Sequence, residues 1–154
     1  MKTMITTSQS PAKSEAMVLG YSPMDDVHAE FHDLVERATY CSDSDFSTRL
    51  DAVVAHLREH FAIEDRWMAE TEFPPGDCHR DEHAAVLRSA DEVLALPLVR
   101  RLEVGRAFVQ ELRNWFPGHA DYLDSALAAW MCKRAHGGKP VVVHGLAAKR
   151  QELT

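Results

Sequence analysis

Apolar positions recur three and four residues apart along most of this chain, which is the spacing of amphipathic α-helices. The pattern predicts four helices, at residues 24–41, 46–70, 77–94 and about 98–130. Polar or proline-containing segments separate them, at residues 42–46 (SDSDF), 73–77 (FPPGD) and 96–98 (LPL). Asp43 or Ser44 is the expected N-cap of the second helix. Four helices joined by short loops favour an all-α, up-down-up-down four-helix bundle.

Length and composition narrow the class of protein. The chain has 154 residues, of which 45% are hydrophobic and 27% charged, as in an ordinary single-domain globular protein. We expect a bundle over residues 21–133 between flexible tails at 1–20 and 134–154. The net charge of −7 without a Lys/Arg cluster argues against nucleic-acid or membrane partners. Three unpaired cysteines and the lack of a long apolar run predict a reduced, cytoplasmic protein.

Histidine is the residue type whose placement suggests chemistry, because it is a usual metal ligand. The second, third and fourth predicted helices each carry two potential ligands, four or five residues apart, and the first carries one near its start. The candidates are His28, His60, Glu64, His79, His83, His119 and Asp124. Neighbouring helices of an up-down bundle are antiparallel, so residues early in the odd helices and late in the even ones share one end. The spacing therefore predicts that five imidazoles and two carboxylates converge there.

The order of these residues resembles the hemerythrins and bacteriohemerythrins over about residues 21–131. The similarity lies in His28 and in the segments HFAIE (60–64), HRDEH (79–83) and HADYLD (119–124), supported by MDDVH and NWF before two of the ligands. It implies two iron ions joined by an oxo or hydroxo bridge. One iron would take His79, His83 and His119, the other His28 and His60, with Glu64 and Asp124 bridging both.

This ligand set, as the resemblance implies it, leaves one coordination position open on the two-histidine iron. Dioxygen would bind there reversibly, for storage, delivery or scavenging rather than for catalysis. An apolar wall is expected around it, with Phe31, Phe61, Trp115 and Phe116 as candidates. The family usually has Leu and Ile where this chain has Phe116 and Ala120, which redistributes bulk around the site.

The fourth predicted helix carries two local irregularities. Pro117 lies inside it, where it removes a backbone hydrogen bond and clashes with an earlier carbonyl, so a kink is expected. His119 and Asp124 are five residues apart, a spacing that places side chains ~140° apart on a regular α-helix. A π-bulge between them would turn both side chains inward.

Several other functions compete with dioxygen binding. HLREH (56–60) and HRDEH (79–83) match the H-x-x-E-H motif of zinc hydrolases, with Glu59 and Glu82 as bases. Two copies in so short a chain suit that chemistry badly, and both glutamates are interpreted as solvated helix charges. His32 and His56 are expected near the site or on the surface. The remaining alternatives are a sensor that meets a protein partner through residues 137–154, and weak peroxidase or nitric oxide chemistry.

Overall fold

The computed structural model describes residues 18–136. Residues 1–17 and 137–154 lie outside the described part of the chain, and with them most of the two predicted tails. The predicted partner-binding segment at 137–154 is among them, so its role stays a prediction.

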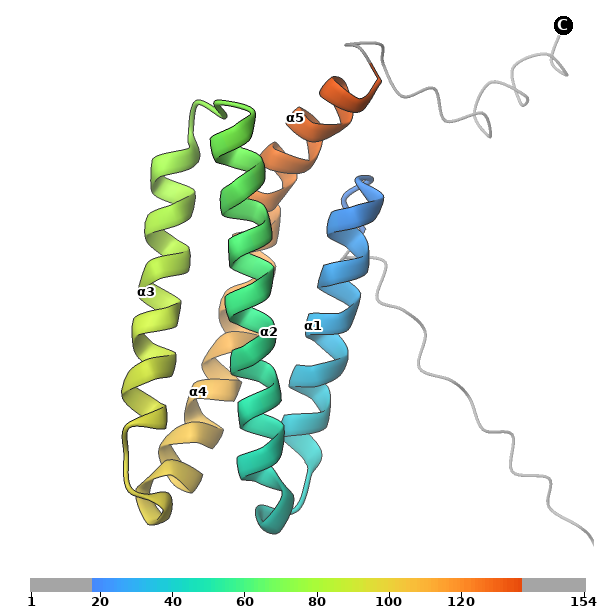
Figure 1. Cartoon of the computed structure of the whole chain (residues 1–154). Helices are drawn as coiled ribbons and strands as arrows, with labels where there is room; N and C mark the ends of the chain where they lie inside the picture. The colour runs from blue at the N-terminus through green and yellow to red at the C-terminus, as the bar shows by residue number, and fades with distance from the viewer. Residues whose placement is uncertain (1–17, 137–154) are drawn as a thin grey trace, which may run out of the picture.

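The described chain is built from helices that run alternately up and down (Figure 1). In chain order they are α1 (Ser22–Tyr40), α2 (Asp43–Glu70), α3 (Gly76–Leu94), α4 (Leu98–His119), η2 (Ala120–Asp124) and α5 (Ser125–Ala135). The last three follow one another without an intervening loop, and together they correspond to the long fourth helix expected from the sequence. The predicted all-α, up-down-up-down bundle is confirmed.

The start of α2 differs from the sequence-based expectation. The helix begins at Asp43, so most of the polar segment 42–46 lies inside it. The N-cap is Ser42, whose hydroxyl accepts a hydrogen bond from the backbone N–H of Asp45 at 3.3 Å. Asp43 and Asp45 then occupy the first turn, where carboxylates interact favourably with the helix dipole. The expected caps, Asp43 and Ser44, were therefore wrong by one or two positions.

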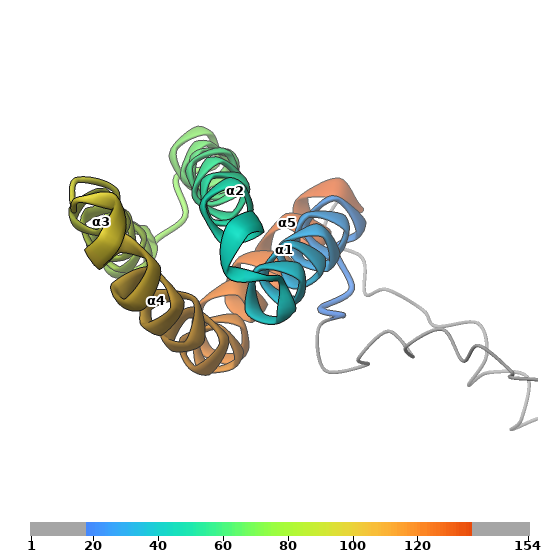
Figure 2. The same ribbon diagram turned by 90° about the horizontal axis from the view of Figure 1, so that it is seen from below.

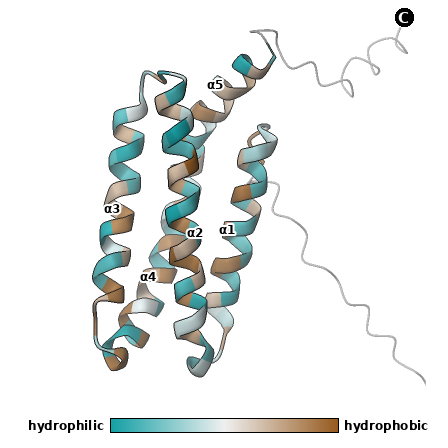
Figure 3. Ribbon diagram, viewed as in Figure 1, coloured by the Kyte–Doolittle hydropathy of each residue, from teal (hydrophilic) through white to brown (hydrophobic). Residues whose placement is uncertain are grey.

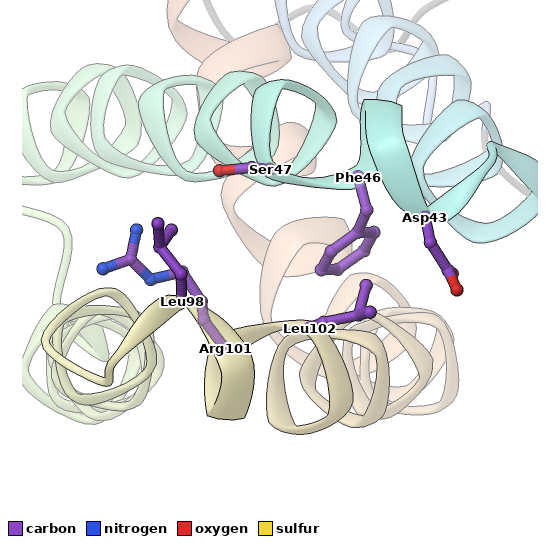
Figure 4. A pocket seen from close by; sticks show the side chains of 6 residues that line it. All are labelled: Asp43, Phe46, Ser47, Leu98, Arg101 and Leu102. Atoms are coloured by element: carbon purple, nitrogen blue, oxygen red, sulfur yellow. The ribbon is translucent and has the colours of Figure 1, made fainter.

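Seen end-on, α1, α2, α3 and α4 occupy four corners, each packed on the next (Figure 2). Helices α2 and α4 also touch across the bundle. Gly105 permits this approach near one end, because a Cβ there would lie only 2.8 Å from the Phe46 ring. Figure 4 shows that ring between the two helices, beside Leu102 and a small pocket.

Apolar and polar residues alternate along every helix (Figure 3), as expected when each helix buries one face. The buried apolar side chains form two separate clusters. The larger includes Phe31, Leu57, Phe61 and Phe116, and the smaller contains Met24, Met68, Phe73, Leu127 and Ala128. Along the chain the predicted ligands fall between members of the two clusters. The described helices include none that combines the length and apolar character needed to cross a membrane.

Candidate metal centre

The structure brings all seven predicted ligands together in the layer between the two apolar clusters. Each is at most 3% exposed: His28, His60, Glu64, His79, His83, His119 and Asp124. They come from α1, α2, α3 and the continuous segment formed by α4 and η2, at one end of the bundle, as the antiparallel arrangement predicted. Burying this many polar groups costs free energy unless they are paired or bind a ligand. Their concentration in one layer therefore requires a chemical explanation.

A π-helical segment brings the last two of these residues to the same face. η2 spans Ala120–Asp124, and the backbone N–H of Ser125 donates to the carbonyl of Ala120, five residues earlier. The predicted π-bulge is confirmed. As a result, His119 Nε2 lies 3.0 Å from Asp124 Oδ1, with both side chains buried. The kink expected at Pro117, which lies inside α4, stays a prediction.

The ligand atoms separate into two overlapping groups. In one group, single donor atoms of Glu64, His79, His83, His119 and Asp124 all lie within 4.8 Å of one another. The other group, with the same spacing, joins His28 and His60 to Glu64. Asp124 also reaches the second group, since its Oδ2 lies 3.1 Å from His28 Nε2. The structure thus places three histidines in one group and two in the other, with two carboxylates that reach both groups.

The orientation of the donor atoms fits metal ions. All five histidines direct Nε2 at a carboxylate, with His60 2.9 Å from Glu64 Oε1 and His79 2.9 Å from Asp124 Oδ1. Yet His79 Nε2, Glu64 Oε2 and both Asp124 oxygens are buried without a hydrogen bond among the described residues. Unsatisfied imidazole nitrogens and carboxylate oxygens that point at a common space form a set of lone pairs suited to cations. Imidazole and carboxylate together suit iron, among other transition metals.

Two further carboxylates bind the outer nitrogens of histidines in the larger group. Asp65 Oδ1 accepts a hydrogen bond from His83 Nδ1 at 2.8 Å, and Glu82 Oε1 accepts one from His119 Nδ1 at 3.0 Å. Glu82 also accepts from Trp115 Nε1 at 2.9 Å. A proton held on Nδ1 leaves the Nε2 lone pair free to face a metal.

Neither of these contacts was predicted from the sequence. Glu82 was expected to be a solvated charge, and that was wrong because the residue reaches across to α4. Glu59, in the matching position of the other motif, is exposed as predicted. Asp65 was not considered at all. The one signal in the sequence that could have indicated these contacts is that Asp65 and Glu82 each adjoin a predicted ligand along the chain.

The four aromatic side chains expected around the site contact its histidines. Phe116 lies edge-on to His28, with ring centroids 5.0 Å apart, and packs against Phe31 at 4.6 Å. On the other side, Phe61 stacks on His83 at 4.0 Å and Trp115 packs on His119 at 4.3 Å. Each half of the centre therefore has its own aromatic cover.

The remaining histidines of α1 and α2 lie outside the two donor groups. His32 is exposed, and His56 is buried with its ring 5.4 Å from that of His60. Burial, followed by the neighbouring His60, lowers the pKa of His56. The zinc hydrolase alternative is not supported, because Glu59 is exposed and Glu82 is bound to the outer nitrogen of His119.

Without metal, the cluster favours protonated imidazoles beside ionised carboxylates. Burial lowers the pKa values of His28 and His79, but the facing carboxylates of Asp124 and Glu64, which accept hydrogen bonds from a protonated ring, outweigh it and raise both pKa values to about 9. For Glu64 and Asp124 burial raises the pKa, and the surrounding histidines outweigh it and bring both well below the usual range. A metal ion that binds here must therefore displace protons from imidazoles.

Comparisons with known proteins agree with this geometry. Residues 19–131 match the family model described as the hemerythrin HHE cation binding domain. A bacteriohemerythrin from Ralstonia nicotianae is 40% identical over 121 residues, covering 79% of this chain and 88% of the relative. The comparison with solved structures found no match. The family match spans most of the chain and includes every residue of the buried cluster, so this protein belongs to the hemerythrin family of HHE cation-binding domains.

Proposed function

We propose that this chain is a non-haem di-iron protein that binds dioxygen reversibly. The observation that carries the proposal is the unequal division of one buried donor set, with three histidines in one group and two in the other. Glu64 and Asp124 reach both groups and are suited to bridge two ions. The name bacteriohemerythrin, borne by a relative at 40% identity, supports the same function.

The two-histidine half is where an exogenous ligand is expected. His28 and His60 offer one imidazole fewer than His79, His83 and His119 on the other side. Two irons with an oxo or hydroxo bridge would supply the electrons and the vacant coordination position that reversible dioxygen binding needs. The protein's own contribution is to hold the histidine nitrogens and the two carboxylates in fixed positions around that vacancy.

Apolar side chains protect the two-histidine half from water. Phe116 and Phe31 pack against each other, and Phe116 covers the ring of His28. Both phenylalanines are 3% exposed, and the ligand layer lies between apolar clusters on either side. Excluding water and protons slows irreversible oxidation of the metal centre, which a reversible carrier requires.

The donor set favours carrying dioxygen over activating it. Imidazoles outnumber carboxylates five to two in the cluster, and such a set stabilises ferrous iron better than high-valent iron. We therefore infer a non-enzymatic role in storage, delivery or scavenging of dioxygen in the cytoplasm. Weak peroxidase or nitric oxide chemistry is the competing outcome.

Oxygen uptake measurements separate the carrier from the enzyme. Protein loaded with Fe²⁺ under argon should take up one dioxygen per pair of irons, and argon should release it as dioxygen. A matched sample of Glu64→Gln should take up much less, because it lacks the carboxylate common to both groups. Continuous oxygen consumption in the presence of a reductant, with no recovery under argon, would instead identify turnover.

A further inference from the structure

We propose that Asp65 and Glu82 make the two metal positions unequal, so that the three-histidine position fills first and holds its ion more tightly. The two-histidine position, where the ligand is expected, then fills second and exchanges more readily. This inference rests on the binuclear centre proposed above and assigns it an order of assembly. Asp65 and Glu82 act as positioning residues, since each contacts a histidine rather than the metal.

The two outer carboxylates connect consecutive helices. Asp65 on α2 reaches His83 on α3, and Glu82 on α3 reaches His119 on α4, at 2.8 and 3.0 Å. Both carboxylates are 38% exposed, whereas the two imidazoles are at most 1% exposed. Each hydrogen bond therefore fixes the tautomer and ring orientation of a buried ligand from the edge of the core. A charged acceptor on Nδ1 also makes Nε2 a stronger donor to a metal.

The two-histidine half has no such support within the described chain. The Nδ1 atoms of His28 and His60 are buried without a hydrogen-bond partner. No outer acceptor therefore orients either ring or holds a proton on its Nδ1 atom, so binding a metal must also fix the ring and its tautomer. In the three-histidine half only His79 shares this condition.

The number of donor atoms, like the outer hydrogen bonds, favours the three-histidine position. Five side chains place a donor atom within 4.8 Å of one another in the larger group, and three do so in the smaller. A metal ion that enters the empty cluster therefore finds more ligands, better oriented, at the three-histidine position. A protein given one equivalent of metal should hold it there.

Trp115 provides a local reporter of that first position. Its ring packs on His119 with centroids 4.3 Å apart. Replacing Trp67 and Trp130 with Phe leaves Trp115 as the single tryptophan of the chain. Paramagnetic Fe²⁺ bound at His119 should quench its fluorescence.

The experiment titrates the metal-free full chain with Fe²⁺ under argon, with a competing chelator to measure affinity for each equivalent. The first equivalent should give most of the Trp115 quenching, and the second should bind more weakly. Asp65→Asn and Glu82→Gln should each weaken the first equivalent about 10–100-fold, the usual effect of losing an outer partner of a metal-bound histidine. Affinity for the second equivalent should change much less. Chelator competition on the natural tryptophan background serves for Glu82→Gln, which also alters the environment of Trp115.

Glu59→Gln is the matched control, because it makes the same change at the same place in the other H-x-x-E-H motif. Glu59 is exposed, so its loss should leave both affinities unchanged. Equal affinity for two equivalents in the natural chain would overturn the proposal, as would equal effects of Glu59→Gln and Glu82→Gln. Failure of the dioxygen proposal is distinguishable, because the stepwise metal affinities are measured without oxygen.

Discussion

Glu64 is the side chain on which the two halves of the centre most depend. It belongs to both donor groups, and its carboxylate lies within 3.4 Å of four different histidines. Spacing within α2 pairs it with His60, and the family resemblance implied its bridging role. Asp65, one residue later, could not be assigned from the sequence, because its contact with His83 depends on how α2 and α3 are rotated against each other.

Replacing Glu64 with Gln should abolish stable binding of two metals. The amide keeps the shape of the side chain, so the bundle should still fold, but it removes the charge and one strong donor oxygen. We expect one metal or fewer per chain by elemental analysis after desalting, against two in the parent. Glu59→Gln should retain two, and two tightly bound metals in Glu64→Gln would refute the shared bridging role.

Phe116 is buried, and its ring covers His28. Phe116→Leu should leave a small cavity there, costing about 1 kcal/mol of unfolding free energy. Water should then reach the centre more easily, so the oxygenated form should decay several-fold faster, as followed by its absorption.

Phe46→Leu is a suitable comparison for this change. Phe46 is also buried, but it lies in the first turn of α2, roughly 20 Å along the helix from His60 at the usual rise per residue. The Phe46→Leu variant should lose a similar unfolding free energy, but its oxygenated form should not decay faster. Equal decay rates in the two variants would show that Phe116 does not protect the centre.

At the level of elements, hydrophobic periodicity predicted most helix ends to within about three residues, whereas the fourth predicted helix ended near residue 130 and α5 continues to Ala135. Among the helix starts the largest difference was at α2, where the Ser42 cap extends the helix into a segment rich in polar residues. The π-helical turn was predictable for a different reason. Two ligands five residues apart can share a face only if the helix widens between them, so the chemistry of His119 and Asp124 required η2.

Because of the π-bulge, we expect two single-residue deletions in this part of the chain to have different effects on the metal centre. Removing the exposed Asp121 converts the five-residue spacing to four, which suits a regular α-helix, so the residues after it keep their orientation. This variant should still bind two metals. Removing the exposed Asn114 from regular α4 should rotate His119 by about 100° relative to the preceding turns and abolish the centre. Circular dichroism and metal content distinguish the two, and equal loss in both would contradict the proposed role of η2.

At the scale of the whole molecule, the antiparallel arrangement accounts for the site. Residues early in α1 and α3 and late in α2 and α4 meet at one level, and apolar clusters close that level on both sides. The meeting of the ligands at one level could be predicted from the order of helices and ligands along the chain. The contacts that make the two halves unequal did not, because they depend on side chains that cross between helices.

The metal-free and metal-loaded proteins should respond oppositely to pH. Without metal, the pKa values of His28 and His79 rise from 6.5 to about 9, so the stability they contribute is complete below about pH 6.5 and is lost as pH rises toward 9. The lowered pKa values of Glu64 and Asp124 contribute stability that is lost in acid, as pH falls below their ordinary values near 4. The metal-free bundle should therefore be most stable between about pH 4.5 and 6.5.

Bound metal reverses the dependence of stability on pH above pH 6, because fewer protons compete with the metal for imidazole as pH rises. From pH 6 through 7.5 to 9, the urea midpoint of the metal-free protein should fall. The increase in the midpoint that Fe²⁺ gives under argon should grow over the same series. Parallel curves for the two forms would mean that the metal does not bind at these histidines.

Metal content together with an absorption spectrum tests the central claim most directly. Protein loaded with Fe²⁺ under argon and then desalted should contain two irons per chain, develop near-ultraviolet and visible bands in air, and lose them again under argon. A colourless protein that retains a single zinc ion and does not respond to air would contradict the account.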